Sequence, residues 1–174
     1  MDRKVNDDGC DCLVSVDCTD CRIEEPHPFS TIWYSHKFNG PGLRYELALS
    51  IKSGHIVWIN GPYECGLWAD IEIFRNSLIS FLDAGERVEA DDGYIGEEPK
   101  TCKTPGGFSS RTELQNKYRM RLRSRHETVN SRLKNFGVLK ERFRHTLKNH
   151  SSAFRACAVI VELAIELGEP LFSL

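Results

Sequence analysis

The sequence predicts one α/β domain built on a mixed sheet, and three observations carry that prediction. First, apolar and polar residues alternate over Leu43–Ile51, which is the period of a half-buried strand. Second, a helical pattern after Asp70 separates this region from a short strand at 86–90, as in a crossover connection. Third, 174 residues with 40% hydrophobic content suit a single globular core.

The first strand is predicted at 13–17. Leu13–Val16 has strand character and runs into the carboxylate of Asp17, while residues 18–20 have the composition of a turn. An acid at the end of a buried strand is held still by the sheet. Residues 1–11 are expected to form a polar tail, and residues 12–174 the domain.

A hairpin follows the first strand. Leu43–Ile51 is its first arm, residues 52–54 form the turn, and His55–Asn60 is the second arm. Gly61-Pro62 is expected to end that arm, because proline cannot donate a ladder hydrogen bond. The strand at 13–17 is expected to pair alongside, which gives a unit of three strands.

The helix after the hairpin is expected to begin at Asp70 as its N-cap and to stop at Gly85. The strand at 86–90 then returns to the sheet and ends at Asp91, so a second acid follows an apolar strand. Residues 95–111 contain three glycines and two prolines and are expected to form a long loop.

A long helix is expected from Thr112 to Gly137, with an apolar stripe on one side. Glu127 lies on the other side, among groups that suit phosphate at helical offsets. These are Arg123, Asn130, Ser131 and Lys134. A last helix is expected from Ser151 or Ser152 to Gly168.

The net charge of −2 conceals a strong segregation. Residues 1–99 carry 19 acids against 8 Lys and Arg, whereas residues 100–150 carry 3 acids against 14. A chain divided in this way can present a basic face to a polyanion, although the two halves can also pair with each other. No apolar run reaches the roughly 18 residues of a membrane span, so no membrane partner is expected.

Four early cysteines leave a zinc site open as an alternative. Cys10, Cys12, Cys18 and Cys21 have C-x-C-x5-C-x2-C spacing, but no histidine pair completes a familiar ligand set. Buried free thiols are the favoured interpretation, and zinc is not expected. Seven cysteines are also an odd number for a secreted disulfide framework, which favours a reducing compartment.

Asp17, Asp91 and Glu127 together indicate a metal site. Two strand ends and one helix face are rigid platforms, and hard divalent ions prefer carboxylate oxygens. Two Mg²⁺ or Mn²⁺ ions about 4 Å apart would activate the attacking and leaving oxygens of a phosphodiester. For Glu127 alone, an ordinary ion pair with Arg123 at i, i+4 is the competing interpretation.

Several phrases resemble the catalytic domain of DDE-type transposases, closest to the Harbinger-like group of DDE superfamily endonucleases. They are Val16–Asp20, Tyr34–Phe38, Gly42–Tyr45, Val57–Pro62, Ala90–Tyr94 and Arg125–Phe136, and the likeness covers roughly residues 12–172. The family's D-x-G-Y phrase falls on Asp91, although Asp92 offers a second register. Its E-x-x-N-x-x-L-K phrase falls on Glu127, and 35 residues separate these two acids.

The resemblance implies an RNase H-like fold, with helices around a mixed sheet of about five strands. It implies metal-dependent cleavage and transfer of DNA strands in the nucleus, with Asp17, Asp91 and Glu127 as catalytic ligands. Arg123, Arg125, Asn130 and Lys134 are expected to contact DNA. A separate Myb-like DNA-binding protein and a homo-oligomer are further expectations.

The chain also departs from the family. Cys18 stands where relatives often have glycine, and only 11 residues precede the first strand, too few for an N-terminal helix-turn-helix-like region. The chain is therefore expected to be a fragment, a truncated gene product or a domesticated derivative. The alternative function is an inactive DNA-binding or interaction module that kept the fold.

Overall fold

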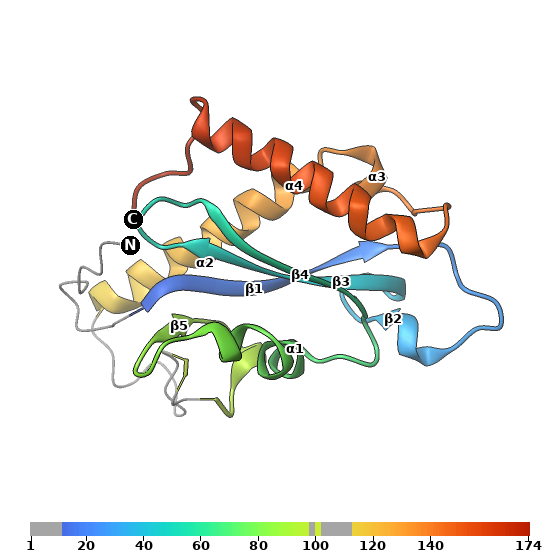
Figure 1. Cartoon of the computed structure of the whole chain (residues 1–174), viewed down its shortest axis with the longest axis horizontal. Helices are drawn as coiled ribbons and strands as arrows, with labels where there is room; N and C mark the ends of the chain where they lie inside the picture. The colour runs from blue at the N-terminus through green and yellow to red at the C-terminus, as the bar shows by residue number, and fades with distance from the viewer. Residues whose placement is uncertain (1–11, 98–99, 102–112) are drawn as a thin grey trace.

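The computed structural model describes residues 12–97, 100–101 and 113–174. A twisted sheet forms the middle layer, with helices α2 and α4 on one face and α1 on the other (Figure 1). The sheet contains five strands in the order β2-β3-β1-β5, and β4 pairs with β3. The predicted RNase H-like fold, a mixed sheet of five strands flanked by helices, is confirmed.

Three antiparallel strands form the centre of the sheet. They are β1 (Cys12–Arg22), β3 (Gly40–Ser50) and β4 (Ile56–Glu64). Val14 pairs with Ser50 and Arg22 with Gly42, so β1 is paired with β3 over almost its whole length. The predicted hairpin is confirmed, but β4 continues past the predicted end at Gly61-Pro62, where its register with β3 shifts.

The expected strand end at Asp17 is wrong. Asp17 pairs with Leu47 in the middle of β1, and the strand continues to Arg22. Residues 18–20 have turn-like composition, yet their partners in β3 offer a full ladder of hydrogen bonds. Tertiary pairing therefore overrides local propensity here.

The short strand β5 (Arg87–Glu89) pairs in parallel with the start of β1. A helical segment connects β4 to it, so the predicted crossover and the mixed character of the sheet are confirmed. The remaining strand, β2 (Tyr34–Ser35), pairs with Gly40 and Pro41 at the start of β3. Short 3-10 helices precede β2 and follow β5, η1 (Thr31–Trp33) and η3 (Asp92–Tyr94).

The helix predicted between Asp70 and Gly85 is shorter than expected. It forms as α1 (Asp70–Asn76) and breaks at Ser77 into the 3-10 helix η2 (Leu78–Phe81). Ala69, not Asp70, is the N-cap residue.

The C-terminal half is helical. It contains α2 (Glu113–Leu133), α3 (Gly137–Lys140), the 3-10 helix η5 (Leu147–Asn149) and α4 (His150–Glu166). Gly137 was expected to end the long helix, but α2 ends at Leu133 and Gly137 begins α3.

The two faces of the sheet support separate cores, as the alternation in β3 predicts. Tyr45, Leu47 and Leu49 lie against α2 and α4, where they contact Val129 and Phe154 among others. Ala48, on the opposite face, belongs to a smaller cluster with Phe74 of α1, Val88 and Tyr94. The larger core therefore holds α2 against the face of β1 that carries Asp17.

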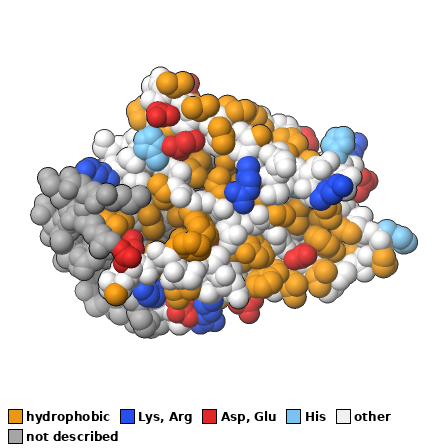
Figure 2. Space-filling view, in the orientation of Figure 1, with side chains coloured by type: hydrophobic (Ala, Val, Ile, Leu, Met, Phe, Trp, Pro, Cys, Tyr) orange, Lys and Arg blue, Asp and Glu red, His pale blue; other side chains and the backbone are white. Residues whose placement is uncertain are grey.

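None of the helices in the described parts of the chain has both the length and the apolar character needed to cross a bilayer. The outer side of α4 does carry exposed apolar side chains, Val159, Ile160 and Leu163. Figure 2 shows hydrophobic side chains gathered along this upper edge of the molecule.

Candidate active site

Asp17 lies at a break in the pairing of β1. On one edge β3 pairs with β1 as far as Arg22, but on the other edge β5 pairs only with Cys12, Val14 and Ser15. Beyond Ser15, in the described chain, this second edge meets no strand until the isolated bridge between Ile23 and Phe143. Asp17 is therefore carried by a buried strand, yet it stands where a ligand can approach the sheet.

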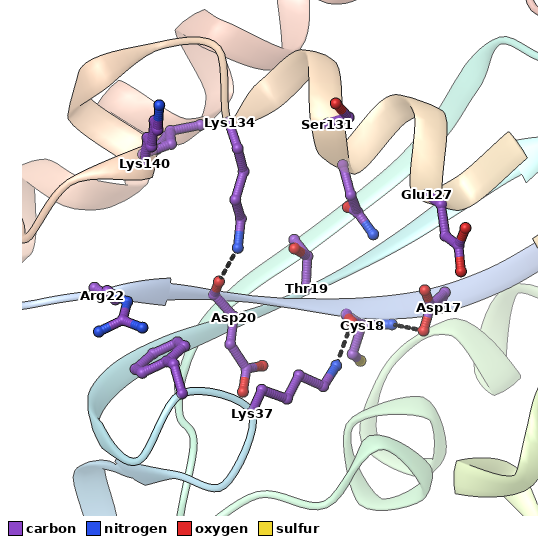
Figure 3. A pocket seen from close by; sticks show the side chains of 13 residues that line it. Asp17, Cys18, Thr19, Asp20, Arg22, Lys37, Glu127, Ser131, Lys134 and Lys140 are labelled. Carbon is purple, nitrogen blue, oxygen red and sulfur yellow. Dashed lines mark hydrogen bonds between the residues drawn. The ribbon is translucent and has the colours of Figure 1, made fainter. Parts of the chain in front are cut away.

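Glu127 of α2 faces Asp17 across a pocket. The carboxylates of the two residues point toward one another (Figure 3), and both line a pocket of about 540 Å³ between β1 and α2. Asn130, one helical turn beyond Glu127, lines the same pocket. Two of the three predicted acids, 110 positions apart in the chain, thus lie at one site.

Asp91 follows β5 by two residues and does not line this pocket, although its charge acts on Asp17. Its side chain caps η3 by accepting a hydrogen bond from the Gly93 amide, at 2.8 Å. A Cβ on Gly93 would lie only 3.0 Å from Asp91 Oδ1, so glycine leaves room for the carboxylate. The glycine of the D-x-G-Y phrase thus accommodates the turn that Asp91 caps.

Asp91 acts electrostatically on Asp17. The pKa of Asp17 is raised to about 6, chiefly by burial; the negative charges of Asp91 and Asp70 contribute to the rise, while Lys37 and the Cys18 amide oppose it. Asp91 also acts on the pKa of His126, the residue before Glu127. The charge of Asp91 therefore affects the pKa of a residue on β1, Asp17, and of a residue on α2, His126.

Buried contacts fix the rotation of α2 that presents Glu127. Val129 and Leu133 are buried in the main core, on the side of the helix opposite the solvent. His126 is buried as well, and its Nε2 lies 2.9 Å from Ser15 Oγ on β1. With these neighbours held inside, Glu127 is directed outward beside the strand.

Arg125 was expected to contact DNA, and the structure contradicts this. Its side chain is buried and donates to the carbonyl oxygens of Ile51, at 2.6 Å, and Phe172, at 2.7 and 2.9 Å. Its donors thus join the sheet to the C-terminal segment. Arg123, in contrast, is exposed on α2.

Lys134 was predicted from the sequence and lines the pocket, whereas sequence reasoning did not select three further basic residues that line it, Arg22, Lys37 and Lys140. Lys37 donates to the Cys18 carbonyl at 2.7 Å, and Lys134 donates to the Asp20 carbonyl, so both lysines hold the unpaired edge of β1. Arg22 and Lys140 line the same pocket. Lys37 lies within the family phrase at Tyr34–Phe38, which was the signal available for it; for Arg22 and Lys140 the sequence offered none.

Asp20 and Asp70 have a structural role on the opposite face of the sheet. Arg44 forms ion pairs with Asp20 and with Asp70, each at 2.8 Å. Burial alone would raise the pKa of Asp20, but the bonds from Arg44 and Ser35 hold it below its ordinary value. The capping role expected for Asp70 is therefore replaced by a buried ion pair.

Burial of two of the early cysteines disfavours zinc binding by them. Cys18 and Cys21 are buried thiols whose pKa values burial raises, which disfavours the thiolate that zinc needs. Cys12 is disulfide-bonded, against the expectation of reduced thiols, and Cys10 lies outside the described residues.

The donor atoms of the candidate carboxylate site suit a hard divalent ion. Asp17, Asp91 and Glu127 supply only oxygen, and Asn130 adds an Oδ1 that is buried without a protein hydrogen-bond partner. Within residues 12–97, 100–101 and 113–174, however, no three acidic, His or Cys side chains already surround one point as ligands. Asp91, whose carboxylate caps η3, would have to turn toward the other two.

The mixed sheet flanked by helices defines the RNase H-like class of fold, and Asp17 of its central strand faces Glu127 of α2. Comparison with known families then identifies the chain: it belongs to the DDE superfamily endonucleases, whose family model matches residues 16–162. It is a DDE-type transposase domain. The Harbinger-like subgroup stays a prediction.

One relative is a probable transposase for insertion sequence element IS702 from Microchaete diplosiphon. It is 30% identical over 143 residues, which cover 76% of this chain and 50% of the relative. The chain thus spans about half the length of the curated relative that it matches. No solved structure matches it significantly.

Proposed function

We propose that this domain cleaves DNA strands, and transfers them, with Mg²⁺ or Mn²⁺ ions held by Asp17, Asp91 and Glu127. The observation that carries the proposal is the meeting of Asp17 and Glu127 in one pocket, with the charge of Asp91 raising the pKa of Asp17. Repulsion between the carboxylates of Asp17 and Asp91 is a cost that a bound cation would offset. Bound ions would supply activation of the attacking and leaving oxygens.

The chain's own residues would orient the DNA. Lys134 lies in the pocket with Asn130, and Arg123 is exposed on the same helix, so a phosphate backbone can lie along α2. Lysine and arginine contacts of this kind bind any sequence, because they meet phosphate oxygens and not base edges. Target choice would then depend on other parts of a longer protein or on a separate Myb-like partner.

The test is nicking of supercoiled plasmid DNA in Mn²⁺ or Mg²⁺. We expect nicking by the wild-type domain and its loss in Glu127→Gln and Asp17→Asn, which keep the shape of each side chain but remove its charge. The matched control is Glu141→Gln, an exposed glutamate beyond α3. Equal nicking by the wild type and Glu127→Gln would refute the proposal.

A second function has support from one observation. The carboxylate of Asp91 is occupied by the η3 cap, and no three-ligand cluster is already formed in the described residues. A domesticated module that binds DNA without cutting it would need no such cluster. Calorimetry separates the two, because the module would bind DNA with a steep salt dependence but would take up neither Mg²⁺ nor Mn²⁺.

Location in the nucleus and assembly as a homo-oligomer are parts of the same proposal. Strand transfer requires DNA access and, in a transposase, the handling of two DNA ends. Microscopy of a fluorescent fusion tests the location, and light scattering with and without DNA tests the assembly. A cytoplasmic fusion or a monomer in both conditions would count against these parts.

A further inference from the structure

A second pocket adjoins the carboxylate pocket and has a different lining. It has a volume of about 310 Å³, within the usual range of small-ligand sites. Three aromatic side chains line it, Phe29, Tyr34 and Phe38, together with Arg22 and Arg142. Glu25 is its one acidic lining residue in the described chain. Aromatic faces and guanidinium groups are what proteins use to stack unpaired nucleobases.

The two pockets share part of their lining. Arg22 and Phe38 line both pockets, so an extended ligand such as a DNA strand bound in the first pocket can enter the second. Asp17 and Arg22 lie at opposite ends of the first pocket, on the same strand (Figure 3). Five residues of extended strand separate them, which is roughly 17 Å, or about five nucleotides at the spacing of B-form DNA.

The stacking surface is held in place before any ligand binds. The guanidinium of Arg22 lies 4.6 Å from the centre of the Phe38 ring. The tip of that ring packs against Gly42, where a Cβ would come within 2.6 Å of it. Phe29, by contrast, is 53% exposed, so its ring is accessible to a ligand in this pocket. A planar apolar ligand would cover it.

We infer that this second pocket binds an unpaired nucleobase of the DNA strand whose phosphate lies at Asp17 and Glu127. The inference rests on the proposed function, since it takes DNA as the ligand. The base would stack on Arg22 and Phe38, and Arg142 would neutralise the phosphate beside it. Such a pocket favours DNA that is bulged, frayed or flipped over DNA that is fully paired, because unstacking has already occurred.

The test compares two duplexes in EDTA, one with a single unpaired 2-aminopurine and one with that base paired. We expect the wild type to bind the unpaired probe more tightly and to quench its fluorescence by stacking. Phe38→Leu should reduce this preference roughly fivefold or more, and Phe29→Leu, whose residue lines only the second pocket, should leave binding of the paired duplex unchanged. Phe29→Leu, at an exposed site, should reduce the preference too, and it keeps the test valid if Phe38→Leu fails to fold.

The matched control is Phe81→Leu, because Phe81 is 69% exposed and does not line either pocket. Equal affinity of the wild type for both duplexes, or a preference that survives both pocket variants, would overturn the inference and leave the proposed function intact. Failure to bind any DNA would overturn both. Binding of unpaired bases without metal-dependent nicking would support the pocket and refute only the nuclease.

Discussion

Glu46 offers a sharp test of how the buried charges of this fold are balanced. It is fully buried on β3, and its Oε2 accepts hydrogen bonds from Trp58 Nε1 at 3.0 Å and Ser77 Oγ at 3.3 Å. Its Oε1 has no protein partner. Burial raises the pKa of Glu46 to about 7, the two hydrogen bonds oppose this, and Asp70 adds to it.

The folded state therefore holds the Glu46 proton more tightly than the unfolded state, whose pKa is near 4.5. Below pH 4.5 both states are protonated, and Glu46 has no effect on the pH dependence. As the pH rises through 7, the folded state must carry a buried charge that the unfolded state solvates. A shift from 4.5 to about 7 corresponds to a loss of about 3 kcal/mol of stability, complete above pH 7.

Glu46→Gln removes this charge and keeps both acceptor contacts. We expect its free energy of unfolding to equal that of the wild type near pH 4 and to exceed it at pH 8 by up to about 3 kcal/mol. Urea denaturation at both pH values measures the difference, with Glu141→Gln as an exposed control. A difference that is the same at pH 4 and pH 8 would refute the reasoning.

Three further predictions follow from the contacts. Arg125→Met should lower stability by about 2–4 kcal/mol, because it leaves buried carbonyls unpaired, and in salt titrations it should not change the slope of DNA binding. Gly42→Ala should lower the thermal midpoint, since its Cβ would meet the Phe38 ring at 2.6 Å; an unchanged midpoint contradicts this. Lys134→Gln should reduce the salt slope by about 1 on any DNA sequence, and an effect on one sequence alone would be evidence against a phosphate contact.

The faces of a strand could be predicted from the sequence where burial of one face makes apolar and polar residues alternate. The alternation over Leu43–Ile51 gave the two faces of β3 correctly, because one face meets α2 and α4 and the other meets α1. The ends of β1 and β4 were not predictable in this way. Thr19 and Asp20 extend β1 because β3 lies alongside with free hydrogen-bonding groups, which no local pattern records.

The arginines of α2 show the same limit at the site. Arg123 and Arg125 look equivalent in a helix with arginine on several sides, so helical spacing could not separate them. The carbonyl that holds Arg125 belongs to Phe172, 47 residues away, and that contact exists only in the folded chain. Likewise, nothing near Arg22 in the sequence indicates that Phe38 will lie beneath it.

The amino-acid sequence by itself determined the class of fold and the family, and it selected three candidate acids, because strand periodicity and the family phrases are local properties of the chain. Tertiary structure alone decided that Asp17 stands where one edge of β1 is unpaired, that Lys37 and Lys134 hold this edge, and that an aromatic pocket adjoins the site. These features arise from groups distant along the chain, and their burial and charge depend on which neighbours the folded core brings to them.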